Sequence, residues 1–506
     1  MNIRSAHSRC VLRTAAILTA LFFFAAYGYR SLSLSFSADA MLLNETSDTA
    51  YQITLGRFLQ PVYWRLRGAV TAPMTIALFS CVFLIASAWL VCLLLDLHGT
   101  GRIALVCGVL TLNETLALAS ATYLPWMDVY ALALLLNVAG VCLYVHARGG
   151  LVWGAVCMAL SMGLYPAYLP VAPTLVILLL MKQLAQGEPT ARIWRQGLGA
   201  CAMLVVSLLL YYLALQAVLG VSSLPASGDY NGVGSASLPP LRELPGMLVR
   251  TYLSPLIMLF ALWGEPAMTW HISTIPAPLN ILCIGAGLIA LALALRGRRA
   301  GAKLTALFLI LVLPLSVNFV QFIAKGLSNG LTIYAFNLLW LIPVMLLHIV
   351  KGRCAAVVRI GCAALCAIFL LNVRTANQMA VKRDLEFSST ASVMTRLLDR
   401  AEAEQGYLPG ETPVVIIGYL PASLLAMERP GFETVAAAQG MRYTYAASYE
   451  TSTYWYLQMA MGERINLVPH EERRALTPAA LEAGLTTYPD EGCCRMIDGR
   501  LYIRIN

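Results

Sequence analysis

The sequence predicts an α-helical multi-pass membrane protein of about eleven transmembrane helices, followed by a small extracytoplasmic α/β domain at the C-terminus. Of the 506 residues, 59% are hydrophobic and only 12% are charged, about half the charged fraction of a soluble protein. Many apolar runs reach the ~18–20 residues that a helix needs to cross ~30 Å of hydrocarbon. After about residue 372 the composition changes to that of a soluble domain.

The first predicted span follows a basic N-terminus. "MNIRSAHSRCVLR" precedes the apolar run "TAAILTALFFFAAYGY", an arrangement that places the N-terminus in the cytoplasm. The sequence Ala38-Asp39-Ala40 resembles a signal-peptidase site. The polar stretch 31–37 separates it from the apolar run, so we interpret the first helix as a signal anchor.

Ten further spans are predicted from apolar runs, two of them, around residues 163–170, shorter than a standard crossing. They cover about 74–97, 103–119, 129–145, 152–164, 168–181, 198–219, 279–295, 304–322, 332–349 and 360–371. Residues 1–372 thus form the predicted membrane domain. Its outer loops are 31–73 and 220–276, and the second contains an apolar, Trp- and Tyr-bearing segment typical of an interfacial or re-entrant helix.

The distribution of basic residues supports this order of spans. The net charge is +9, and most basic residues fall in the loops assigned to the cytoplasm, where they fix topology. Their position makes nucleic acid an improbable partner. The loop 31–73 is the exception, because it carries Arg57, Arg65 and Arg67 on the outer side.

Residues 373–506 are predicted to form the extracytoplasmic α/β domain. "TPVVIIGYL" and "RMIDGRLYIRIN" have strand patterns, and Asp498-Gly499 between two alternating runs indicates a two-residue hairpin turn. "RLLDRAEAEQG" indicates a helix that ends at glycine.

Neither cysteine nor histidine spacing predicts a metal site. Most of the 13 cysteines lie in apolar runs, where cysteine packs as a small hydrophobic residue. Cys493 and Cys494 are adjacent, which is poor geometry for a mutual disulfide.

The acids of the first outer loop are candidate catalytic residues. Asp39, Glu45 and Asp48 precede Arg57 in a loop that must rest on the bilayer. A carboxylate can act as a general base, and a guanidinium can bind a phosphate in a bidentate manner. The alternative is structural: Asp39 can be a turn residue, and Asp48 can lie in the first turn of a helix.

Arg65 and Arg67 are further candidates for phosphate binding. Both flank the next span, so anchoring of the loop to anionic lipid headgroups is an equally weighted alternative. Arg57 is the stronger candidate, because it follows the acids most closely.

Two other segments carry candidate residues at the outer ends of spans. Asp128 begins the span after "TYLPWM", and ionisable residues at membrane depth are functional candidates, although this one can simply cap its helix. Tyr165 and Tyr168 lie in "GLYPAYLP", either a re-entrant turn that lines a substrate cavity or an outer loop with interfacial tyrosines.

The ordered motifs resemble those of the integral-membrane glucosyltransferases that modify O-antigen, of the serotype-converting type. "SADAMLLNETSDTAYQITLGRFLQPVY" is similar to the family's first outer loop, "LNETLALASATYLPWMDVYALALLL" to its next loop and "ALSMGLYPAYLPV" to its Gly-Leu-Tyr element. "YPDEGCCRMIDGRLYIRIN" resembles the tail. Members often have paired acids where this chain has Ala38-Asp39, and Gln where it has Pro166.

This resemblance implies a GT-C-like glycosyltransferase of the bacterial inner membrane. It implies a donor of the undecaprenyl-phosphate-glucose type, a polysaccharide acceptor outside the membrane, and a separate donor synthase and flippase. Asp39 would then be the base, with Glu45 and Asp48 in reserve, Asp128 would orient the sugar or acceptor, and Arg57 would hold the phosphate. No cofactor besides the lipid-linked donor is demanded, and carboxylates beside phosphates can also hold a divalent metal.

Two other classes of function remain open at this point. A polymerase or ligase of envelope glycans would have a similar number of spans, but a large mid-chain outer loop rich in Arg, whereas 220–276 has only Arg242 and Arg250. A transporter or lipid flippase would favour matched broken helices in two related halves, and no half-repeat is visible.

Overall fold

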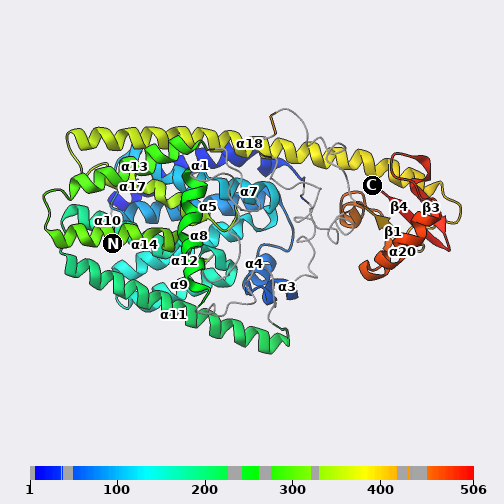
Figure 1. Ribbon diagram of the computed structural model, residues 1–506, viewed down its shortest axis with the longest axis horizontal. Helices are drawn as coiled ribbons and strands as arrows, with labels where there is room; N and C mark the ends of the chain where they lie inside the picture. The colour runs from blue at the N-terminus through cyan, green and yellow to red at the C-terminus, as the bar shows by residue number, and fades with distance from the viewer. Residues whose placement is uncertain are drawn as a thin grey trace.

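The computed structural model describes residues 6–35, 37, 49–225, 242–260, 275–320, 330–418, 431, 432, 435 and 453–506. A bundle of long helices occupies one end of the molecule and a small domain with a β-sheet the other (Figure 1). The fold class predicted from the sequence is confirmed.

Each of the eleven predicted spans corresponds to one helix or to one set of consecutive helices. Eight described helices are long and apolar enough to cross a membrane alone, and α6 with α7 makes a ninth as a bent pair. The remaining two, α9 and the unit 334–346, are shorter. In order, the helices are α1 (Ala6–Leu32), α5 (Pro73–Leu94), α6 (Thr100–Thr111), α7 (Glu114–Thr122), η2 (Leu124–Trp126), α8 (Met127–His146), α9 (Gly150–Leu164), η3 (Pro166–Tyr168), α10 (Val171–Gln186), α11 (Thr190–Ser222), α13 (Ala277–Ala294), α14 (Ala300–Val317), α16 (Tyr334–Asn337), η4 (Leu338–Trp340), α17 (Leu341–Leu346) and α18 (Arg353–Glu402).

Among the described residues of the membrane domain, three shorter helices lie outside this set. α3 (Thr49–Thr54) and α4 (Gln60–Leu66) belong to the first predicted outer loop, and α12 (Leu244–Phe260) to the second. α12 runs across the direction of α11 and α18 in Figure 1. The sequence predicts an interfacial or re-entrant helix there, and this crossing direction agrees with it.

The bend between α6 and α7 has a local cause. Leu112 and Asn113 interrupt the helix, and the two halves meet at 44°. The carbonyls left free by a broken helix need donors. Tyr334 donates to Leu110 O at 2.7 Å and Tyr27 to Thr111 O at 2.8 Å. Asn113 then caps α7 by accepting from Leu116 N at 3.0 Å.

The C-terminal domain contains a four-stranded sheet in the order β2-β1-β4-β3. The strands are β1 (Pro413–Ile417), β2 (Asn466–Leu467), β3 (Cys494–Ile497) and β4 (Arg500–Arg504). β1 is parallel to β2 and β4, and β3 pairs antiparallel with β4. The predicted hairpin is confirmed: its turn, Asp498-Gly499, has φ of 49° and 74°, as a two-residue type I′ turn requires.

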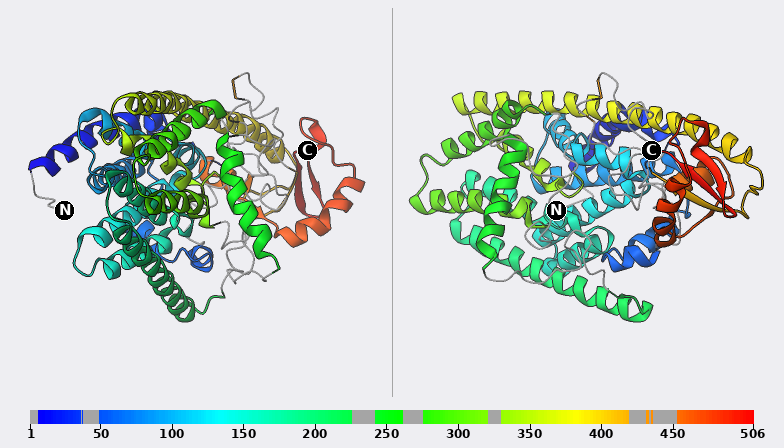
Figure 2. Two further views of the ribbon diagram at one scale, coloured as in Figure 1. Left: turned by 60° about the vertical axis from the view of Figure 1, so that its left-hand side comes forward. Right: turned by 45° about the vertical axis from the view of Figure 1, so that its right-hand side comes forward.

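The two faces of this sheet are covered by different helices (Figure 2). α20 (His470–Glu482) packs on one face, where Ala480 shares a core with Val415. The outer part of α18 packs on the other face, where Leu397 shares a core with Val414 and Ile416. All 13 cysteines are free.

The helix α18 joins the bundle to this domain without interruption. It is 50 residues long, or about 75 Å at 1.5 Å per residue, and it packs against α13 and α1 before it reaches the sheet. The predicted domain boundary at 372/373 therefore falls inside a helix. An apolar run such as 360–371 marks where a helix lies in lipid, and the helix itself continues into water through polar residues.

Candidate active site

The candidate residues that the structure describes lie at the end of the bundle nearest the C-terminal domain. α3 and α4 lie at this end in Figure 1, and they meet the segment 163–165 and the start of α8. Asp39, Glu45 and Asp48 lie outside the described residues. Arg57 contacts Tyr165, which lies beside Tyr168, and Arg67 pairs with Asp128, whereas Arg65 is exposed.

Gly56 presents Arg57 through a tight turn at the end of α3. Gly56 N donates to Ile53 O and Arg57 N to Gln52 O, both at 2.9 Å, and Gly56 has a φ of 78°. This left-handed conformation after a helix favours glycine. The Gly56 carbonyl also accepts from the Tyr211 hydroxyl at 3.0 Å, so α11 fixes the turn from outside.

Arg57 lies over an aromatic ring. Its guanidinium carbon lies 5.1 Å from the centre of the Tyr165 ring, within the range of a cation–π contact. The side chain is partly exposed, and Gln52 Oε1 lies at the hydrogen-bond limit, 3.5 Å from Nη1. A guanidinium held in this way keeps its charge near the surface and can form a bidentate contact with a phosphate.

Gly56→Ala is expected to reorient Arg57 and to lower activity. A Cβ at residue 56 would overlap the Tyr211 hydroxyl, and the residue would keep an unfavourable positive φ. We expect a local destabilisation of about 1–2 kcal/mol from the backbone, with a further loss from the overlap. Thermal unfolding in detergent and transfer activity would be measured together.

Two variants separate the causes of this effect. Gly68 has a φ of 106° and open space around it, so Gly68→Ala tests backbone strain alone. In Gly56→Ala/Tyr211→Phe the hydroxyl is gone and the nearest ring carbon lies 3.5 Å from the new Cβ, so part of the activity should return. Equal activity of Gly56→Ala and wild type would contradict the assigned role of the turn.

Asp128 forms a buried ion pair with Arg67. Arg67 Nη1 lies 2.6 Å from Asp128 Oδ1, and the two side chains are 1% and 0% exposed. The same nitrogen donates to Pro125 O at 2.7 Å. Asp128 Oδ2 accepts from the Tyr63 hydroxyl at 2.9 Å. Burial and the neighbouring Asp128 carboxylate raise the pKa of Tyr63, so Tyr63 remains a donor at neutral pH.

This pair attaches α4 to the first turn of α8. Both carboxylate oxygens of Asp128 have partners, since Oδ1 also accepts from Val129 N at 3.0 Å. In this geometry Asp128 and Arg67 form an ion pair with each other, and neither side chain is exposed to solvent. Their predicted roles toward the sugar and the phosphate stay predictions.

The tyrosines of "GLYPAYLP" lie at different depths. Tyr165 contacts Arg57 and lies 4.4 Å, centre to centre, from Tyr130. Tyr168 is 1% exposed and stacks on Tyr334 at 5.1 Å. Its hydroxyl has no hydrogen-bond partner among the described residues. Tyr165 is therefore the one placed beside the candidate phosphate site, and the predicted substrate role of Tyr168 stays a prediction.

The C-terminus of α7 is a junction that the sequence analysis did not single out. Three consecutive carbonyls there accept from three different segments: Ser120 O from Arg30 Nε at 3.1 Å, Ala121 O from Arg383 Nε at 2.9 Å, and Thr122 O from Ser37 Oγ at 2.5 Å. Cations are favourable at a helix C-terminus. The available signal was the charged group "KRDLE" at 382–386, after the last apolar run.

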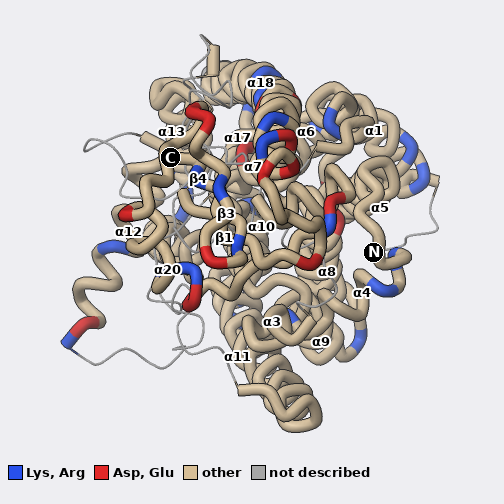
Figure 3. Tube along the Cα trace, turned by 90° about the vertical axis from the view of Figure 1, so that its right-hand side faces the viewer, with Lys and Arg blue, Asp and Glu red and all other residues tan. Residues whose placement is uncertain are grey.

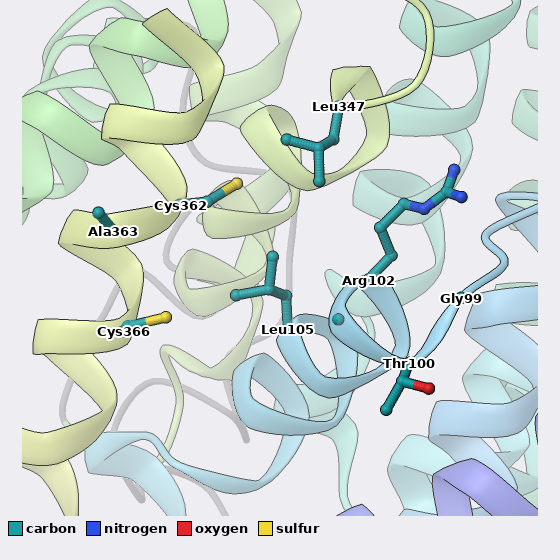
Figure 4. A pocket seen from close by; sticks show the side chains of 9 residues that line it. Gly99, Thr100, Arg102, Leu105, Leu347, Cys362, Ala363 and Cys366 are labelled. Carbon is teal, nitrogen blue, oxygen red and sulfur yellow. The ribbon is translucent and has the colours of Figure 1, made fainter. Parts of the chain in front are cut away.

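One hollow of about 480 Å³ lies at the opposite end of the bundle. Figure 4 shows it between the start of α6, with Gly99, Thr100 and Arg102, and the α18 residues Cys362 and Cys366. It contains none of the candidate residues. The described residues also contain no group of three or more His, Cys, Asp or Glu side chains that could hold a metal ion.

A protein-family model matches more than half of the chain. The family model described as "Glucosyl transferase GtrII" matches residues 31–347. This range contains every candidate residue from Asp39 to Tyr168. No curated protein and no solved structure matches the chain.

Proposed function

Since this chain belongs to the GtrII family of glucosyl transferases, we propose that it moves glucose from a polyprenyl-phosphate donor onto a polysaccharide outside the cytoplasmic membrane, such as O-antigen. The family match supports a glycosyltransferase embedded in a membrane. The donor, the acceptor and the residues that act on them are our proposal.

The observation that carries the choice of donor is the position of Arg57. A lipid-linked sugar places its phosphate at the membrane surface, and the enzyme must hold that phosphate while the sugar leaves. Arg57 is a partly exposed guanidinium at one end of an apolar bundle, held by Gly56 and Tyr165. Phosphate would bind the guanidinium through two parallel hydrogen bonds.

The proposed reaction is a displacement at the anomeric carbon of glucose. An acceptor hydroxyl forms the new C–O bond while the bond to the phosphate oxygen breaks, and the phosphate leaves with the electron pair. Asp39 takes the proton of the hydroxyl, with Glu45 and Asp48 as reserve candidates. Arg57 stabilises the charge that develops on the leaving phosphate. Phosphate is a fair leaving group, so positioning and charge stabilisation suffice without a nucleotide cofactor.

We propose an orientation in the bacterial inner membrane with the N-terminus in the cytoplasm. The loops at the end of the bundle opposite the C-terminal domain carry basic residues, among them Arg148, Arg296 and Arg298, as cytoplasmic loops do. The end with α3, α4 and the C-terminal domain would then be periplasmic. We further propose that this domain contributes to acceptor recognition, and that a separate synthase and flippase supply the donor.

The test is the structure of the outer glycan in cells. The gene is deleted and complemented with wild type, with Asp39→Asn or with a control, Asp96→Asn. Asp96 is exposed at the other end of the bundle. We expect a side-branch hexose to vanish on deletion and to return with wild type and with the control, but not with Asp39→Asn at equal abundance in the membrane.

Other results would reject the proposal. A change in chain length or in total polymer without a change in branching would indicate a polymerase or ligase. An unchanged glycan would exclude glycan transfer onto this acceptor and would leave transport to be tested.

A further inference from the structure

We propose that Asp384, with Arg30, is a positioning residue that holds the start of the first outer loop against α7. This inference rests on the proposed function, because that loop continues to the candidate base. Asp384 lies on α18, 345 residues after Asp39 in the chain, and no motif in the sequence connects the two.

Arg30, which is buried, and Asp384, which is half-buried, both form hydrogen bonds to Ser33 and Ser35. Asp384 Oδ1 accepts from the hydroxyls of Ser33 and Ser35, the latter at 2.5 Å. Arg30 donates to Ser33 O at 2.9 Å and to both the hydroxyl and the carbonyl of Ser35. Arg30 is 1% exposed. Each serine is thus held through its hydroxyl and its backbone at once.

Asp384 and Arg30, called the clamp below, connect three helices. Asp384 Oδ2 accepts from the Tyr29 hydroxyl of α1 at 2.5 Å. Arg30 Nε reaches Ser120 O, at the end of α7, at 3.1 Å. On α18, the neighbouring Arg383 donates to Ala121 O, also at the end of α7. α18, which Figure 3 shows nearly end-on, carries both basic and acidic residues, and Lys382 and Arg383 both pair with Glu386.

Residues 33–35 and 37, called the stem below, are attached to the end of α7. Ser37, two residues after Ser35, donates to Thr122 O at 2.5 Å and is fully buried. Asp39 follows Ser37 by two residues in the sequence. Thr122 is followed after a short 3-10 turn by Asp128, which holds α4. The same helix end therefore anchors the stem and leads to the segment that orients α4.

A displacement of the stem would misplace the proposed base, Asp39, relative to the donor. A substitution far from the reacting atoms that misplaces a catalytic group by about 1 Å can lower the rate ~100-fold. The donor phosphate is assigned to Arg57, which belongs to a different segment. Loss of the clamp should accordingly lower kcat and leave KM for the donor nearly unchanged.

The decisive comparison is Asp384→Ala against Asp384→Asn. The asparagine keeps an oxygen that accepts from both serines, and its amide group can donate to the Tyr29 hydroxyl. We expect Asp384→Ala to lower kcat by roughly 10- to 100-fold and Asp384→Asn to retain most of the wild-type kcat. Ser33→Ala/Ser35→Ala should behave like Asp384→Ala. Asp399→Asn, an exposed change on the same helix, is the matched control.

A second readout separates this inference from the proposed function. Hydrogen exchange of the purified full-length protein in detergent should show faster exchange at 33–37 in Asp384→Ala, with α20 and the sheet unchanged. Unaltered kcat and exchange in Asp384→Ala would overturn the inference, as would a loss of activity that only follows the folded fraction. If wild type itself transfers no glucose, the proposed function fails, and the exchange data alone decide whether Asp384 holds the stem.

Discussion

Replacing Arg57 by alanine is expected to lower the rate of glucose transfer by about 10²–10³-fold while the protein remains folded. Removing one group that stabilises developing charge in a transition state typically costs about 10²–10³ in rate. The structural loss should be small, because Arg57 is partly exposed. Its contact with the Tyr165 ring is worth about 0.5–1 kcal/mol. Membranes with equal amounts of each variant would be assayed with a polyprenyl-phosphate glucose donor.

Two substitutions calibrate this result. Arg57→Lys keeps the charge but loses the planar fork, so it should recover only part of the activity and show a raised KM for the donor. Arg148→Ala removes an exposed arginine at the opposite end of the bundle and should match wild type. Full activity of Arg57→Ala would move the phosphate site elsewhere, with Arg65 the next candidate because it is exposed.

Asp128→Ala is expected to have the largest effect on stability. It leaves the Arg67 guanidinium buried without its counter-charge, and breaking one side of a buried ion pair typically costs about 3–5 kcal/mol. It also removes the acceptor of the Tyr63 hydroxyl. We expect low abundance in the membrane and a lower midpoint of thermal unfolding in detergent.

The double variant Asp128→Ala/Arg67→Met separates stability from chemistry. It removes both charges, and replacing a buried pair by apolar residues is often neutral or stabilising, so the unfolding midpoint should recover. If transfer also recovers, Asp128 and Arg67 serve to hold α4. If the midpoint recovers and transfer does not, Asp128, Arg67 or both take part in the reaction. Glu188→Ala breaks the exposed pair with Arg192 and should change the midpoint little.

The fold was predictable because lipid leaves few alternatives. Backbone groups in hydrocarbon must bond within a helix, so apolar runs in the sequence sufficed to locate the eight or nine long apolar helices of the described residues. The Asp498-Gly499 hairpin was predictable for a similar reason, since two consecutive residues with positive φ restrict the sequence strongly.

Pairing between distant segments was not predictable from one sequence. Arg67 and Asp128 were both candidates, but nothing local shows that they bind each other across 61 residues. Arg30 was missed because it follows an apolar run and has the appearance of an interfacial charge. Asp384 was missed because it lies in the segment assigned to the extracytoplasmic domain. The role of Gly56 was predictable only in part: a glycine after a short helix favours a turn, whereas its contact with Tyr211 depends on the packing of α11.

The continuity of α18 has a consequence for how the two units unfold. One helix contributes Leu365 and Ile368 to the core of the bundle and Val393, Met394 and Leu397 to the core of the C-terminal domain. Neither unit can lose this helix and keep its own core, so their melting should be cooperative. Exchanges of the tail between relatives should therefore join within α18, in helical register and before Phe387, because a junction after Glu402 would separate the sheet from the helix residues that complete its core.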